Sequence, residues 1–280
     1  MNKDHLQELL TNVWQKTGYD FREYRRQTIE RRIAKRMALL NVADLPAYRE
    51  ILDRDPEEYW YLISELTIKV SRLFRNPYVF EFMDQAIWPE LLRPPGADKH
   101  LRLWSAGCAY GEETYSLAIS ILDHMERKKI PLKDYEITII GTDIDEEALM
   151  LARAGQYGPD TVGEVKKRLL DRYFDYKNGY YNIMPVVRKM VTFAVHDLTS
   201  PTIMSPPSGV ITNYDLISCR NLLIYFAPAL QERVLSKLLR VLNPGGYLVL
   251  GESEALPPQL SDCLRVFDKR ANIYQKMKGT

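Results

Sequence analysis

The sequence predicts an α/β protein in which a helical N-terminal region precedes a mainly parallel sheet covered by helices on both faces. Two observations lead to this prediction. Beyond about residue 100, five short apolar runs ending in polar or small residues alternate with helical segments. Residues 1 to about 90 contain no clear strand pattern. A chain of 280 residues is long enough for one large domain or two smaller domains with cores of their own.

Apolar residues recur at helical spacing through the N-terminal region. We expect helices at 6–16, 21–37, 45–53, 56–67 and 78–92. The stretch RPPGADKH, residues 93–100, interrupts this pattern with Pro-Pro-Gly and is a predicted linker. The predicted organisation is therefore a helical domain at 1–92, a linker at 93–100 and a sheet domain at 101–280.

The apolar runs beyond the linker are predicted strands because they are short and almost continuously apolar. They lie at 101–107, 135–145, 190–197, 214–221 and 246–252. Helices are predicted between them, at 112–125, 146–154 and 229–242. Ligands of such sheets bind beyond the carboxyl ends of the strands, so the polar residues at those ends form the candidate site.

Composition narrows the class of protein. The chain is 46% hydrophobic and 27% charged, which is typical of a soluble globular protein, and no apolar run approaches the roughly 18 residues that a membrane span needs. We therefore expect a cytoplasmic protein. The three cysteines lie far apart and match no zinc or disulfide spacing, so we expect reduced thiols and no metal. A net charge of +1 gives no general attraction to nucleic acid.

The stretch LWSAGCAYGEE, residues 103–113, joins the first predicted strand to a helix through a loop containing Gly107 and Gly111. Such loops usually bind phosphate at the helix N-terminus. Here Glu112 and Glu113 occupy the first helical turn and would repel a phosphate. The loop therefore favours a ligand that carries an amine, a sulfonium or hydroxyls. The alternative is that both acids only complement the helix dipole.

Polar residues follow the other predicted strands as well. Asp143 ends the second strand, where doubly wound folds place an acid on ribose hydroxyls, while Asp145 is a candidate helix cap. Asp197 follows the third strand, and Arg220 with Asn221 follows the fourth. Any one of them is explained as a cap or turn residue, but together they predict a small-molecule site in one crevice.

Residues 21–37, FREYRRQTIERRIAKRM, contain seven basic residues against two acidic ones, with apolar residues at helical spacing. This pattern predicts an amphipathic helix whose outer face is cationic. Within it, Arg25, Arg32 and Arg36 lie roughly on one face by helical spacing. We expect them to dock an acidic partner; the alternative is a solvated helix surface.

The stretches SRLFRNPYVFEFM, LWSAGCAYGEETYSLAI, GTDID, ISCRNLLIYF and NPGGYLVLGESE together resemble the CheR-type chemotaxis receptor methyltransferases, and the resemblance extends over residues 19–275. It implies a class I, Rossmann-like methyltransferase sheet, an N-terminal helical domain and a small antiparallel β-subdomain at about 172–190. It also implies transfer of a methyl group from S-adenosyl-L-methionine to receptor glutamates, with S-adenosyl-L-homocysteine as the product.

The resemblance also assigns roles to individual residues. It implies that the cofactor is bound by Ser71, Arg75, Glu112, Asp143, Asp197, Leu198, Arg220 and Asn221. Arg75 and Tyr225 are the candidate catalytic residues, with aromatic packing as the alternative role of Tyr225. Lys69 and the loop residues 108–110 depart from the family pattern, which leaves their own cofactor contacts open.

The implied partners are the cytoplasmic domains of methyl-accepting chemoreceptors, with no nucleic acid, contact with membranes only through receptors, and a monomeric enzyme. Residues 172–193 predict a hairpin that turns at Asn178-Gly179, with 186–193 returning as the next strand. The short turn favours an enzyme that does not need a receptor's C-terminal pentapeptide. The alternatives are a methyltransferase of the same fold with another protein, a small molecule or nucleic acid as substrate, and an S-adenosylmethionine-sensing scaffold.

Overall fold

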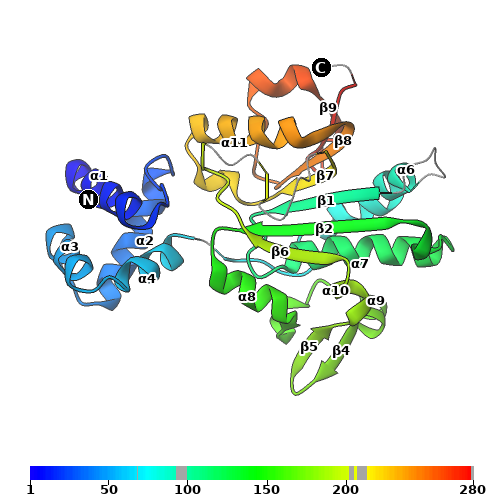
Figure 1. Ribbon diagram of the computed structural model, residues 1–280, viewed down its shortest axis with the longest axis horizontal. Helices are drawn as coiled ribbons and strands as arrows, with labels where there is room; N and C mark the ends of the chain where they lie inside the picture. The colour runs from blue at the N-terminus through cyan, green and yellow to red at the C-terminus, as the bar shows by residue number, and fades with distance from the viewer. Residues whose placement is uncertain (68, 93–99, 202–204, 207–212, 279–280) are drawn as a thin grey trace.

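The computed structural model describes residues 1–67, 69–92, 100–201, 205–206 and 213–278. The predicted linker at 93–100 therefore lies outside the described residues, except for His100. Four helices form an N-terminal helical unit: α1 (Lys3–Thr17), α2 (Arg26–Leu39), α3 (Leu45–Arg54) and α4 (Glu58–Leu66). Their apolar faces meet in one buried cluster that extends from Leu6 to Leu66. Figure 1 shows this unit to one side of the sheet.

Local capping explains where two of these helices begin. The side chain of Asn2 accepts from the amide of Asp4 at the start of α1, and Asp44 accepts from the amide of Ala47 at the start of α3. Helix α2 begins at Arg26, later than the predicted start at 21, because the preceding residue has extended backbone angles of φ −61° and ψ 120°. At its N-terminus the helix is therefore five residues shorter than predicted.

The helical prediction at 78–92 corresponds to α5 (Pro77–Phe82), the π-helical turn η1 (Met83–Ile87) and α6 (Trp88–Leu91). These elements pack with the sheet rather than with α1–α4, since their buried residues share a cluster with Leu101 and Leu103. By its packing, the helical region predicted as one domain at 1–92 thus contributes to two cores. We propose that the domain boundary lies near residue 68.

The main sheet has seven strands in the order β6-β2-β1-β7-β8-β10-β9. The strands are β1 (His100–Ala106), β2 (Glu136–Asp143), β6 (Val191–Val195), β7 (Tyr214–Cys219), β8 (Leu242–Leu250), β9 (Leu264–Asp268) and β10 (Ile273–Lys276). The first five in the order are parallel, whereas β10 is antiparallel to both neighbours. The predicted α/β class is confirmed, and all five predicted strands are present. The carboxyl ends of β2, β1 and β7 therefore lie together at one edge.

Helices cover both faces of this sheet, as predicted. Helix α11 (Pro228–Val241) packs in one buried cluster, and α7 (Glu112–Arg127) packs in a second cluster on the opposite face. Figure 1 shows α11 on one side of the strands and α7 with α8 (Glu146–Ala154) on the other. Shorter elements complete the fold: η2 (Leu132–Asp134), η3 (Pro159–Thr161), α9 (Lys167–Tyr173), η4 (Leu223–Tyr225) and η5 (Pro258–Cys263).

A small antiparallel sheet projects from the domain, with β3 (Gln156–Tyr157), β4 (Phe174–Lys177) and β5 (Tyr180–Ile183) in the order β3-β5-β4. Its hairpin turns at Asn178 and Gly179, whose φ values of 54° and 81° match the predicted turn. The prediction of a strand over 186–193 is wrong in its first half. Pro185 opens the helical turn α10 (Pro185–Arg188), so β6 begins only at Val191. No helix within the described ranges is long and apolar enough to cross a bilayer.

Candidate functional site

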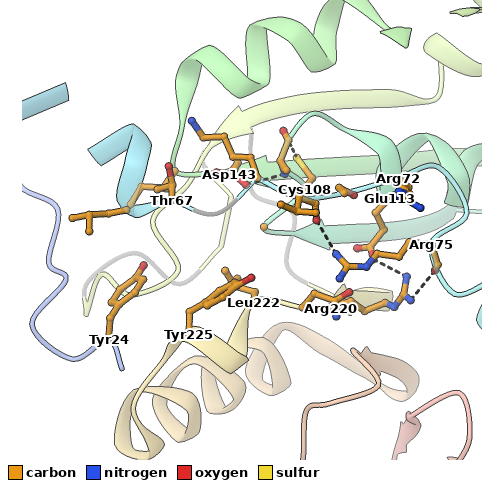
Figure 2. Close-up of a pocket in the computed structure, with 18 of the residues that line it drawn as sticks. Tyr24, Thr67, Arg72, Arg75, Cys108, Glu113, Asp143, Arg220, Leu222 and Tyr225 are labelled. Atoms are coloured by element: carbon orange, nitrogen blue, oxygen red, sulfur yellow. Dashed lines mark hydrogen bonds and ion pairs between the residues drawn. The ribbon is translucent and has the colours of Figure 1, made fainter. Parts of the chain in front are cut away.

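A cavity lies at the carboxyl ends of β1, β2 and β7, facing the N-terminal helical unit (Figure 2). Three loops of the sheet domain line it, together with the segment that leads out of α4. The lining includes the predicted residues Ser71, Arg75, Asp143, Arg220, Asn221 and Tyr225. The structure therefore gathers six of the predicted site residues, far apart in the sequence, around one cavity.

The loop between β1 and α7 requires its glycines. Gly107 has a φ of 76°, and a Cβ atom there would lie 2.8 Å from the side chain of Leu222 across the cavity wall. Ala109 also has a positive φ, 49°, and its amide donates to the Asp143 carboxylate over 2.8 Å. The tight loop thus brings its backbone against the acid that ends β2.

Asp143 keeps acceptor capacity for a ligand. One carboxylate oxygen accepts from the Ala109 amide, and the other accepts from the Asp145 amide over 3.1 Å. Since each carboxylate oxygen has two lone pairs, both oxygens remain able to accept another hydrogen bond. Burial raises the pKa of Asp143. Asp145 has the predicted capping role, since it accepts from the Ala148 amide over 2.8 Å, and it also pairs with Lys69.

The two glutamates at the start of α7 differ in their surroundings. Glu113 lines the cavity, where it accepts from the Ser105 hydroxyl over 2.9 Å and pairs with Arg220 at 3.2 Å. Glu112 is only 3% exposed and is not among the cavity-lining residues that the structure describes, but it bonds Ser71, which lines the cavity; its Oε2 atom has no partner among the described residues. Burial raises the pKa of Glu112 to about 7, although its hydrogen bond with Ser71 and the charge of Arg75 lower it.

Arg220 is the most enclosed cation of the site, with a side chain that is 3% exposed. One terminal nitrogen donates to the Arg75 carbonyl and to the Asn76 side chain, both over 2.9 Å. Its Nε atom has no acceptor within the part of the chain that the structure describes. Arg75 itself donates to the Val70 carbonyl over 2.7 Å. Both predicted arginines are therefore held by backbone carbonyls at the cavity.

Sequence reasoning missed Glu254, which is buried and shapes the loop after β7. Its carboxylate accepts from the backbone amides of Gly251, Asn221, Leu222 and Leu223 over 2.5, 3.1, 2.8 and 2.7 Å. Burial raises its pKa. Because these bonds hold Asn221 at a φ of 58°, Glu254 positions a predicted site residue. In the sequence, Glu254 is recognisable only as an acidic residue shortly after a strand. That pattern does not identify its partner loop, which lies more than thirty residues away.

Asp197 and Leu198 lie near this region but are not among the cavity-lining residues that the structure describes. Asp197 accepts from the amide and hydroxyl of Thr199 over 2.8 and 2.7 Å. The carbonyl of Leu198 accepts from Lys237 over 2.8 Å. Their predicted contacts with a cofactor stay predictions.

The cationic face of α2 is largely occupied by partners within the helical unit. Arg36 forms two hydrogen bonds with the buried carboxylate of Glu58, over 2.7 and 2.5 Å. Arg32 and Lys35 both bond Glu65, over 3.1 and 2.9 Å. Arg25 donates from Nε to the Phe226 carbonyl over 3.3 Å. The three arginines predicted to bind a partner therefore also hold the protein's own structure together.

The site fits a small ligand that carries charges of both signs and hydroxyls. The unpartnered Glu112 oxygen suits an ammonium, the unpartnered Arg220 nitrogen suits a carboxylate, and Asp143 can accept from a diol. Buried polar groups without partners are rare, and an amino-acid moiety would satisfy two of opposite sign, on the cavity-lining Arg220 and on Glu112 next to the cavity-lining Ser71.

Two family models match this chain. The family model described as "CheR methyltransferase, SAM binding domain" matches residues 69–273, and the one described as "CheR methyltransferase, all-alpha domain" matches residues 4–67. Chemotaxis protein methyltransferase 1 of Pseudomonas aeruginosa is 34% identical over 70% of this chain and 69% of its own length. Chemotaxis protein methyltransferase 2 of Vibrio cholerae is 29% identical over 95% of this chain and 91% of its own length.

Another relative, a 104.1 kDa protein of Rhodobacter capsulatus, is 36% identical over 92% of this chain, which spans only 26% of that protein. Similarity to solved structures is weaker. The methyltransferase CalS10 of Micromonospora echinaspora, solved with S-adenosylmethionine, has a TM-score of 0.31 and 15% identity over 64% of this chain and 52% of its own.

Proposed function

This chain belongs to the CheR methyltransferase family, and on that premise we propose that it transfers methyl groups from S-adenosyl-L-methionine to glutamate carboxylates of chemoreceptors. The observation that carries the proposal is a pair of unpartnered buried atoms, one on Arg220, which lines the cavity with Asp143, and one on Glu112, which bonds the cavity-lining Ser71. The cofactor's ammonium, carboxylate and ribose diol match these three groups in sign and hydrogen-bonding type.

The residues that would hold the cofactor come from both sides of the cavity. Asp143 would accept from the ribose hydroxyls, Glu112 with Ser71 would bind the ammonium, and Arg75 or Arg220 would bind the carboxylate. Asn221, Asp197 and Leu198 are the proposed neighbours of the adenosine part. When bound, the cofactor supplies an activated methyl group on a sulfonium.

The protein's own contribution to methyl transfer is to position the acceptor carboxylate. The acceptor is a glutamate, whose pKa is ~4.3 in water, so it is already ionised at neutral pH and needs no general base. The chain must orient this carboxylate and exclude water from it, and orientation alone contributes up to roughly 7–11 kcal/mol in favourable systems. We propose that Arg75 orients the carboxylate and that the Tyr225 hydroxyl holds the accepting oxygen or the methyl group.

The proposed receptor contact is electrostatic. Arg25, Arg32 and Arg36 on the N-terminal helical unit would face an acidic methylation region and steer its approach. The two-residue turn at Asn178-Gly179 leaves little glycine-rich backbone for a peptide to approach, which supports recognition without a C-terminal pentapeptide. Titrating such a receptor peptide into the protein tests this. Micromolar binding would contradict it, whereas no binding together with normal methylation of a tail-less receptor would support it.

The main test is methyl transfer itself. The protein is incubated with radiolabelled S-adenosylmethionine and receptor cytoplasmic fragments, and the label is tested for release by mild base. A glutamate methyl ester is base-labile, so the proposal expects volatile label with the parent and much less with Asp143→Ala. Base-stable label would indicate a nitrogen or carbon acceptor and exclude the glutamate assignment. Salt-dependent nucleic-acid binding would instead favour a nucleic-acid substrate, and cofactor binding without transfer would favour a sensing scaffold.

A further inference from the structure

The turn that precedes α2 pairs directly with the loop that carries Tyr225. The Arg25 amide donates to the Tyr225 carbonyl over 2.7 Å, and the Ala227 amide donates to the Glu23 carbonyl over 2.9 Å. An ion pair between Arg233 and Glu23 adds to this contact. The N-terminal helical unit thus holds the backbone of the candidate catalytic loop on both sides of Phe226.

At the centre of this pairing is Tyr24, which forms an antiparallel bridge with Phe226. Its ring packs edge-on against Phe226, with centroids 4.8 Å apart, and lies 5.0 Å from Phe21. Tyr24 lines the same cavity as Tyr225 and Asp143. Figure 2 shows the two tyrosines side by side along one wall of the cavity. The ring is therefore held in place while its hydroxyl end belongs to the cavity.

The surroundings keep this hydroxyl protonated. Burial raises the pKa of Tyr24 well above its ordinary value, and the carboxylates of Asp197 and Asp143 raise it further. The hydroxyl therefore remains a hydrogen-bond donor as well as an acceptor at any physiological pH. The two acids that act on it are those proposed above for the adenosine end of the cofactor.

We propose that Tyr24 is a further binding residue of the methyl-transfer site, through which the N-terminal helical unit contacts the adenosine side of bound S-adenosylmethionine. This inference rests on the proposed function, since it assigns the ligand from it. It gives the helical unit a second role besides receptor docking, because the unit supplies a wall of the cofactor pocket and fixes the loop of Tyr225 through adjacent residues.

The test is calorimetric titration of S-adenosylhomocysteine into the full chain and its variants. Tyr24→Phe removes one oxygen and keeps the ring that packs on Phe226, so the fold is preserved. We expect it to bind about fivefold more weakly than the parent, which corresponds to about 1 kcal/mol. The matched control is Tyr19→Phe. Tyr19 comes from the same unit and also lies in the field of Asp197, but Tyr24 is the one that lines the cavity. We expect the control to bind like the parent.

The outcomes separate this inference from the proposed function. If the parent binds and Tyr24→Phe binds equally well, the hydroxyl contact is absent and the inference is overturned while the function stands. An equal loss in both variants would mean a general loosening of the helical unit and would also overturn it. If the parent itself does not bind S-adenosylhomocysteine, the proposed function fails and the inference fails with it.

Discussion

The N-terminal helical unit and the polar edge of the sheet differ in how completely their buried charged groups are hydrogen-bonded. In the helical unit, the buried Glu58 carboxylate is bonded twice by Arg36 and once by the Tyr48 hydroxyl. At the sheet edge, Glu112 and Arg220 are buried and each has an atom without a partner among the described residues. The helical unit has a lesser exception in Arg32, whose Nε lacks a partner although its Nη1 bonds Glu65.

This difference indicates where a ligand binds. A buried charge that is fully bonded holds the fold together, whereas an unbonded one costs folding free energy and is tolerated where a ligand completes it. From sequence alone, the seven basic residues of 21–37 were the most conspicuous charged feature. The structure instead indicates a ligand site at the sheet edge, because most of the basic residues in 21–37 already have partners within the protein.

The largest expected effect is on Glu254, a buried carboxylate at the sheet edge that accepts from four backbone amides. Replacing it by Gln leaves one acceptor oxygen and turns an NH2 group toward backbone donors. We expect a loss of about 3 kcal/mol in the free energy of unfolding. Urea unfolding at pH 7 measures it, with the exposed Glu252→Gln as the matched control. Equal stability of the two variants would show that the sheet edge does not depend on paired charge.

The second prediction concerns Asp143, whose free acceptor sites set it apart from the bonded acids. We expect Asp143→Ala to weaken S-adenosylhomocysteine binding about 100-fold, since two hydrogen bonds to a charged group contribute about 3 kcal/mol together. Receptor binding should change little. Calorimetry with S-adenosylhomocysteine measures the cofactor affinity. The control is the neighbouring Asp145→Asn, which loses a helix cap and an ion pair instead. Unchanged affinity in Asp143→Ala would remove it from the site.

The third prediction uses the pKa of Glu112, which is about 7 in the folded chain against an ordinary 4.5. The folded state therefore binds more protons than the unfolded state between these values, so stability falls as pH rises from 4.5 to 7. Glu112→Gln removes this dependence and should stabilise the unliganded protein by about 2 kcal/mol at pH 8. Unfolding curves at pH 5 and pH 8 measure the change.

The same acid gives a ligand-linked readout. If an ammonium pairs with Glu112, the pKa of Glu112 falls on binding, and Glu112 releases a proton near pH 6.5. Calorimetry in two buffers with different ionisation enthalpies detects that proton. Parent and Glu112→Gln should differ in the number of protons released, and an identical number would argue against the pairing.

The smallest effect is expected on α2. Arg31 is exposed and has no salt-bridge partner among the described residues, whereas Arg36 bonds the buried Glu58. We expect Arg31→Glu to raise the receptor KM about fivefold at low salt, in the range of an exposed charge contact of ~1 kcal/mol, and to leave cofactor affinity unchanged. Arg36→Gln should also lower stability, because Arg36 bonds the buried Glu58. A receptor KM that is the same for Arg31→Glu and parent across a salt series would reject a receptor contact at Arg31.

Local sequence alone determined much of the sheet domain. The alternation of apolar runs and amphipathic helices placed β1, β2, β6, β7 and β8, because strand and helix periodicity are set by neighbours a few residues apart. The position of Asp143 followed from the same pattern, since parallel strands end at one edge. The hairpin turn at Asn178-Gly179 and the cap at Asp145 are local too, and both were predicted.

Only the tertiary structure decided which distant groups meet. Helix α2 starts at Arg26 rather than at 21 because the preceding turn pairs with a loop two hundred residues away. Glu254 and the partners of Arg36 and Arg32 were invisible for the same reason, since nothing in a short window identifies an acceptor brought in by chain closure. Strands β9 and β10 also escaped prediction; they are short and partly exposed at the sheet's end, where burial does not impose a continuous apolar pattern.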